Sequence, residues 1–114
     1  MDERIEKAFA VASYMATLAN QKRIILEEFN QKLVHYVDGA TFKITPELIG
    51  FVNTMVDRPF DLILTDSNNL PVKISEPKKF LGDIIALYDT ASTEYYEKYS
   101  AIKSKRKIAD IVEL

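Results

Sequence analysis

The feature that most constrains the fold is a run of 35 residues, from Asp2 to Tyr36, that contains neither glycine nor proline. Apolar side chains recur along it at alternating steps of three and four residues, which is the seven-residue repeat of helices that pack side by side. Nine of the ten positions in this repeat are apolar: Ile5, Ala8, Ala12, Met15, Ala19, Lys22, Leu26, Phe29, Leu33 and Tyr36. The pattern predicts one long helix over residues 2–36, with one charged residue, Lys22, in its seam.

The end of this helix has a second interpretation. Residues 33–37 and 40–44 flank Asp38-Gly39, a pair that is typical of the type I′ turn in a β-hairpin. We favour a helix that reaches Tyr36, with Gly39 just past its end in the left-handed conformation. The reason is that the seven-residue repeat continues unbroken to Tyr36.

Residues 40–75 are predicted to form a small α/β insert. Thr45 and Pro46 are typical of a helix start, because threonine caps the N-terminus and proline fits the first helical position. Residues 61–65 and 70–74 read as strands around a cluster of turn-forming residues. They predict a β-hairpin or, together with a short strand before Thr45, a three-stranded antiparallel sheet.

A second run, residues 77–112, carries the same repeat and is interrupted only by Gly82. Eight of its ten repeat positions are apolar: Leu81, Ile84, Tyr88, Ala91, Tyr95, Lys98, Ile102, Lys105, Ala109 and Val112. The predicted fold class is therefore α+β and mainly helical, with two long amphipathic helices flanking the insert. The length of the chain predicts a single domain over residues 1–114.

The first helix is too long and too widely apolar to be covered by one neighbouring helix. Its 35 residues span roughly 50 Å, whereas a compact domain of this size measures about 35 Å. Val11, Tyr14, Leu18 and Ile25 widen its apolar stripe. We expect a homo-oligomer, a dimer or higher, formed through the long helices; a kink near residues 20–23 that folds the helix back is the alternative. The side chains expected at the interface are Ile5, Ala12, Met15, Lys22, Leu26, Phe29, Leu33, Tyr88, Tyr95 and Tyr99.

The composition leaves few routes to catalysis. Cysteine is absent, so thiolate chemistry is excluded. His35 is the only histidine, so metal sites with several histidines and catalytic triads that contain histidine are nearly excluded. The three glycines lie too far apart for a phosphate-binding loop. A calcium loop starting at Asp66 fails, because Pro71 and Pro77 occupy the positions that need glycine and glutamate. We expect no enzyme, no cofactor and no bound metal.

The net charge is −2, from 15 basic and 17 acidic residues. The chain as a whole therefore has no excess of positive charge with which to bind phosphates, and we expect no nucleic-acid partner. A local basic group lies on the second helix: Lys98, Lys103, Lys105, Arg106 and Lys107. The alternative function is therefore a small nucleic-acid-binding or transcription-modulating factor. The basic group has two other interpretations: a contact with an acidic protein partner, or a solvent-exposed helix end whose positive charges complement the helix dipole. The apolar runs are far shorter than the roughly 20 residues of a membrane span, and we expect a cytoplasmic protein without membrane contact.

Five segments of the chain carry a resemblance. Residues 14–18, 21–22, 39–49, 66–72 and 94–96 are similar to a small protein carried by large contractile-tailed phages of marine cyanobacteria. The resemblance implies a phage accessory, virion or assembly component, in the host cytoplasm or the virion, and it carries over no catalytic or binding residues. We expect a non-enzymatic interaction or structural protein, a self-associating helical scaffold, with further protein partners left open.

Overall fold

A computed structural model describes the backbone of residues 2–112 and the side chains of residues 2–104. In chain order the elements are α1 (Glu3–Lys32), β1 (Val34–Val37), β2 (Ala40–Lys43), α2 (Pro46–Met55), β3 (Ile63–Thr65), β4 (Pro71–Lys73) and α3 (Pro77–Val112). The predicted class, mainly helical α+β with two long helices flanking a small insert, is confirmed.

Contacts group the chain into two units. Unit 1 takes the chain up to Glu28 and again from Glu94, and unit 2 runs from Phe29 to Thr93. Each long helix therefore contributes one segment to each unit. The single domain expected from the length stays a prediction.

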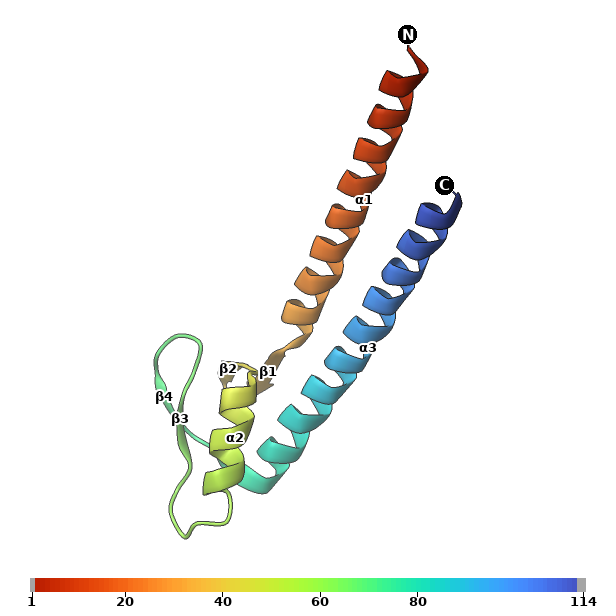
Figure 1. The fold of residues 1–114 in the computed structure, drawn as a ribbon. Coiled ribbons are helices and arrows are strands. Elements are labelled where there is room, and N and C mark those ends of the chain that lie inside the picture. The colour runs from red at the N-terminus through yellow and green to blue at the C-terminus, as the bar shows by residue number, and fades with distance from the viewer. Residues whose placement is uncertain (1, 113–114) are drawn as a thin grey trace. The chain divides into compact units, whose positions relative to one another are not determined.

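Unit 1 consists of two helical segments that run antiparallel and side by side (Figure 1). Leu18 and Ile25 of α1 and Ile102 of α3 form its buried cluster, and Tyr14 packs against it. Helix α1 is continuous through residues 20–23. The alternative fold, in which the helix kinks there, is therefore wrong.

The side of α1 that is buried in unit 1 is not the predicted seam but the side next to it. Leu18 and Ile25 are 5% and 9% exposed, whereas Met15 and Leu26 of the predicted seam are 46% and 45% exposed. Leu26 lies one residue after Ile25 and therefore about 100° further around the helix.

Helix α3 buries the seam that the repeat predicts. Ile84 and Ala91 are buried in unit 2, and Ile102 is buried in unit 1. Ile84 and Ile102 are 18 residues apart, about five turns at 3.6 residues per turn, so they share one side of a straight helix. The last three predicted seam positions, from Lys105 on, lie outside the described side chains.

Unit 2 has a core to which its strands and helices all contribute. Phe42 of β2, Val52 of α2 and Phe80 and Ile84 of α3 are almost completely buried. The rings of Phe42 and Phe80 pack edge to face, with centroids 5.4 Å apart. Helix α2 begins where the sequence predicts, with the Thr45 hydroxyl accepting a hydrogen bond from a backbone N–H of its first turn.

The chain between residues 33 and 44 forms a β-hairpin, so the predicted helix end at Tyr36 is wrong. Helix α1 ends at Lys32, and β1 pairs antiparallel with β2. Asp38 and Gly39 have φ angles of 52° and 74°, the positive values that a type I′ turn requires and that Asp-Gly adopts readily. The hairpin delivers Phe42 to the core of unit 2, which a longer helix would not do.

A second hairpin, β3–β4, is a separate two-stranded sheet, so the alternative of one three-stranded sheet is wrong. Its turn is organised by Asp66, whose buried carboxylate accepts hydrogen bonds from two backbone N–H groups of the turn. The two hairpins are linked where the backbone N–H and the hydroxyl of Ser67 donate to the carbonyl of Thr41, at 2.9 and 2.8 Å. Turn chemistry, not calcium, accounts for the residues around Asp66.

Asp38 also holds the first hairpin to Ser75, two residues before the start of α3, and its removal tests this link. Its carboxylate accepts from the backbone N–H of Ser75 at 3.1 Å and from the Ser75 hydroxyl at 2.9 Å. We expect Asp38→Ala to lower the free energy of unfolding by about 1–3 kcal/mol, because two hydrogen bonds to a charged group are lost. Urea denaturation measures this change. The exposed Asp57→Ala is the matched control, and an equal loss in both variants would contradict the role of Asp38.

Candidate interaction surface

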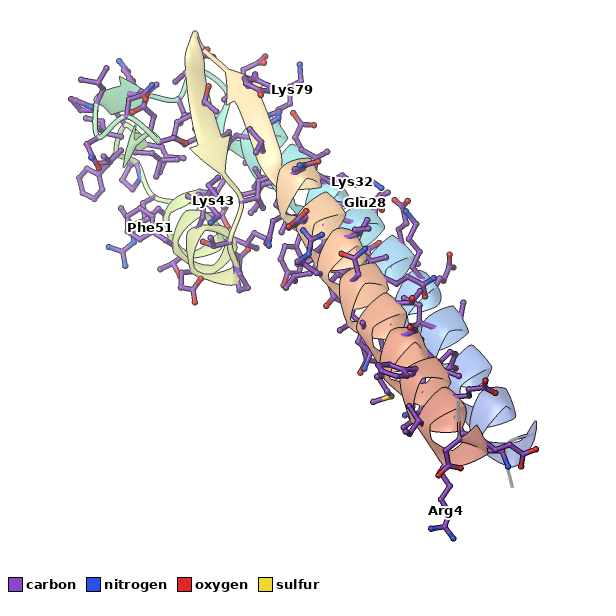
Figure 2. The ribbon with its side chains drawn as sticks, turned by 90° about the horizontal axis from the view of Figure 1, so that it is seen from above. Arg4, Glu28, Lys32, Lys43, Phe51 and Lys79 are labelled. Carbon is purple, nitrogen blue, oxygen red and sulfur yellow. The ribbon has the colours of Figure 1, made fainter. Side chains whose placement is uncertain are left out.

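One flank of the buried cluster in unit 1 is an ion cluster between the two helices. The Lys98 Nζ atom lies 2.7 Å from Glu28 Oε2 and 2.9 Å from Glu94 Oε1. Figure 2 labels Glu28 on the α1 side of this contact. Lys98, predicted to meet nucleic acid or an acidic partner, is thus already paired with carboxylates of its own chain.

This cluster changes the acidity of Lys98. The hydrogen bonds that its ammonium donates, first to Glu28 and then to Glu94, raise the pKa of Lys98 above its ordinary value of 10.5. The ammonium is half-exposed and remains charged across the physiological range. Its role in the structure is to join α1 to α3.

The opposite flank of the same cluster is aromatic. The Lys22 Nζ atom lies 5.6 Å from the centroid of the Tyr99 ring, a cation–π contact between α1 and α3. Tyr95 and Tyr99 stack with centroids 6.4 Å apart and an interplanar angle of 25°. Lys22, Tyr95 and Tyr99, three of the residues predicted at an interface, therefore lie together here. Lys22 lies on α1 between the buried side of the helix and the exposed side that carries the predicted seam.

Beyond Lys22, the outer side of α1 carries a run of exposed apolar side chains that Arg23 interrupts between Ala19 and Leu26. We call this set the α1 stripe: Ile5, Ala8, Phe9, Ala12, Met15, Ala16, Ala19 and Leu26. At about 100° per residue these positions fall within about 120° of the helix circumference. Phe9, the largest of them, is 60% exposed. Four of the predicted interface residues belong to this stripe, and nothing in the described chain covers them.

Sequence reasoning missed one exposed aromatic residue of unit 1. Phe9 lies one position after Ala8 of the predicted seam, and a count of apolar residues beside the seam, rather than on it, would have found it. Tyr96, which the sequence groups with Tyr88, Tyr95 and Tyr99 on the second long helix, is 73% exposed.

Three other predicted interface residues are used inside unit 2. Leu33 belongs to its buried core, and Phe29 and Tyr88 pack against that core. The Phe29 and Tyr88 rings meet edge to face at 6.2 Å and 71°. These side chains therefore stabilise the fold of unit 2, and their role at an interface stays a prediction.

The basic group at the end of α3 is described only in part. Lys103 is exposed, whereas Lys105, Arg106 and Lys107 lie outside the described side chains. With Lys98 paired to two carboxylates, Lys103 is the one member whose exposed position is established. A nucleic-acid or acidic partner at this group stays a prediction.

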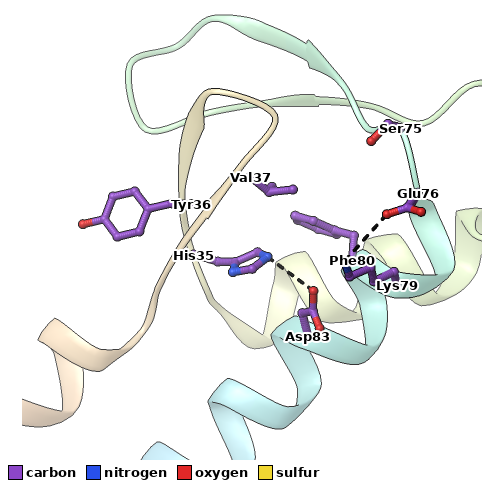
Figure 3. A pocket seen from close by; sticks show the side chains of 8 residues that line it. All are labelled: His35, Tyr36, Val37, Ser75, Glu76, Lys79, Phe80 and Asp83. Atoms are coloured by element: carbon purple, nitrogen blue, oxygen red, sulfur yellow. Dashed lines mark ion pairs between the residues drawn. The ribbon is translucent and has the colours of Figure 1, made fainter.

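Unit 2 contains a small cavity of about 160 Å³ beside His35 (Figure 3). The His35 Nε2 atom is buried and has no hydrogen-bond partner within the described chain. It lies 3.8 Å from Asp83 Oδ2, too far for a hydrogen bond, and its ring packs against Phe80. Among the described residues no group of three or more potential ligands is placed to hold a metal ion. The surroundings of His35 supply an apolar contact with Phe80 and a nearby carboxylate, that of Asp83.

A shallow, mainly apolar groove of about 570 Å³ also lies between α2 and α3 within unit 2. It is lined by Pro46, Ile49, Gly50, Ile85, Tyr88, Asp89 and Ser92. Exposed aromatic residues occur elsewhere in the unit, including Phe51, which is labelled on α2 in Figure 2. They are spread over several elements, in contrast to the α1 stripe, which follows one helix.

Comparison of the chain with protein-family models, with curated proteins and with solved structures finds no match. Among the described residues, no helix combines the length and the apolar character that crossing a membrane requires.

The ion cluster predicts a pH-dependent contribution to stability. Because the pKa of Lys98 is raised, its stabilising effect is complete below 10.5 and is lost as the pH rises through the raised value. We expect Glu28→Gln to be less stable than the parent protein at neutral pH, and this difference to shrink at more alkaline pH. Urea denaturation across this range measures it.

Glu27→Gln is the matched control for this experiment. Glu27 pairs with Arg23 of the same helix at 2.7 Å, and arginine keeps its charge at alkaline pH. Any stability difference of Glu27→Gln should therefore stay constant over the pH range in which that of Glu28→Gln shrinks. Parallel behaviour of the two variants would contradict the role of Lys98.

Proposed function

We propose that this chain is a non-enzymatic interaction protein that self-associates through its long helices and acts as a helical scaffold. The α1 stripe is the observation that carries the proposal. In the described chain α3 packs against one side of α1, and the adjacent side, equally apolar, faces outward.

The size of the stripe supports a docking role. From Ile5 to Leu26 it extends over 22 residues, or about 33 Å. With a helix width of about 10 Å, the apolar surface is on the order of 300 Å². Arg23 interrupts this surface between Ala19 and Leu26, and burying its apolar part in a partner is favourable.

The biological setting follows from the resemblance to a protein of large contractile-tailed phages. On that basis the scaffold would serve as a phage accessory, virion or assembly component. Other protein partners fit the same surface chemistry, because the stripe selects for apolar character and not for a particular charge pattern.

A charge placed in the stripe tests the proposal. We expect the parent protein at tens of micromolar to exceed the 13.0 kDa mass of one chain in size-exclusion chromatography with light scattering. Ala12→Glu should shift the protein to a monomer, because association would bury an unpaired carboxylate. Circular dichroism should show unchanged helix content, since Ala12 is exposed.

Ser13→Glu is the matched control, since Ser13 is exposed and lies about 100° away from Ala12 around the helix. It should associate like the parent protein. A parent protein that is monomeric at every accessible concentration would refute the proposed function.

A further inference from the structure

We infer that the α1 stripe docks on the same stripe of a second copy, with the two α1 helices antiparallel about a two-fold axis at Ala12. The inference rests on the proposed function and adds the surface, the orientation and the register of the contact. It follows from the order of large and small residues along the stripe and from the charges at its ends.

The stripe from Ile5 to Ala19 has the same spacing in both directions from Ala12. An antiparallel pair centred there brings each stripe position opposite another stripe position of the second copy: Ile5 opposite Ala19, Ala8 opposite Ala16, Phe9 opposite Met15, and Ala12 opposite Ala12. Self-complementarity of this kind is what a two-fold interface between identical chains requires.

The side chains also suit a close approach of the two helices. Alanine occupies four of the seven positions from residue 5 to residue 19, and small side chains permit helix axes about 8 Å apart. Ile5 then packs against an alanine instead of another large side chain. Phe9 meets Met15 of the second copy, and contact between a thioether and an aromatic ring is favourable.

The charges agree with a partner of this kind. None of the seven stripe positions from Ile5 to Ala19 is charged, so the surface fits an equally uncharged one. An antiparallel pair also brings the acidic start of one chain, Asp2 and Glu3, toward the end of the stripe that carries Arg23 on the second copy. Arg23 already pairs with Glu27, and Asp2 of the second copy adds a further carboxylate. The two-fold axis repeats this charge pairing at the other end of the contact.

The area sets the strength of the contact. Fifteen residues of helix cover about 22 Å by 10 Å, or roughly 220 Å² for each copy. A stable, specific interface commonly buries about 800 Å² for each partner. We therefore expect a weak, reversible dimer whose population rises with protein concentration.

Single cysteines test the register, because the chain contains no cysteine of its own. After mild oxidation at high protein concentration, Ala12→Cys should shift from 13.0 kDa to twice that mass on a non-reducing gel. Ala19→Cys, within the stripe, and Ser13→Cys, outside it, are the matched controls. In the proposed register the two copies of residue 19 lie about 21 Å apart along the helix, beyond the roughly 7 Å that a disulfide spans.

The outcomes separate this inference from the proposed function. Linkage of Ala12→Cys alone supports the antiparallel register. Linkage of both Ala12→Cys and Ala19→Cys means a parallel pair and overturns it. An oligomer in light scattering without linkage at residue 12 also overturns it and leaves the proposed function standing. A parent protein that is monomeric in light scattering at the concentration used overturns both.

Discussion

The turn of 3.6 residues in a straight α-helix determines which side of α1 is buried, and the exposed surface of unit 1 follows from it. Leu18 and Ile25 fall on the side that packs with Ile102 of α3. Ala19 and Leu26, one residue later, fall about 100° further around the helix and face outward. Both sides are apolar, so packing against α3 alone leaves apolar side chains of α1 exposed, among them Met15 and Leu26.

The two units differ in how completely they satisfy their own apolar residues. Unit 2 brings two hairpins, α2 and the start of α3 around one core. Its buried groups include Phe42 and Phe80, although Phe51 and Phe60 of the same unit are 50% and 69% exposed. In the described part of unit 1 only two helical segments are available, and two helices cover one side of each other. Its buried cluster is accordingly small.

Local signals predicted much of this structure, and the failures occurred where two signals competed. The cap at Thr45 and the seam of α3 could be read directly, because each depends on residues close together in sequence. The end of α1 could not, since the apolar repeat and the Asp38-Gly39 turn both fit residues 33–37. The choice depends on the distant core that accepts Phe42. The ion cluster at Lys98 was also beyond sequence reasoning, because its partner Glu28 lies 70 residues away.

The two sides of α1 differ in the polar residues that lie beside them, and this difference bears on which partner each side can take. The buried side is flanked by the Lys98 ion cluster and by Lys22 over the Tyr99 ring. These contacts need complementary groups at matching heights on the second helix, and α3 supplies them. The α1 stripe has no charged residue from Ile5 to Ala19, so an oppositely charged surface gains nothing by covering it. A helix that docks there is selected by shape and by its lack of charge, and the same segment of an identical chain has both properties.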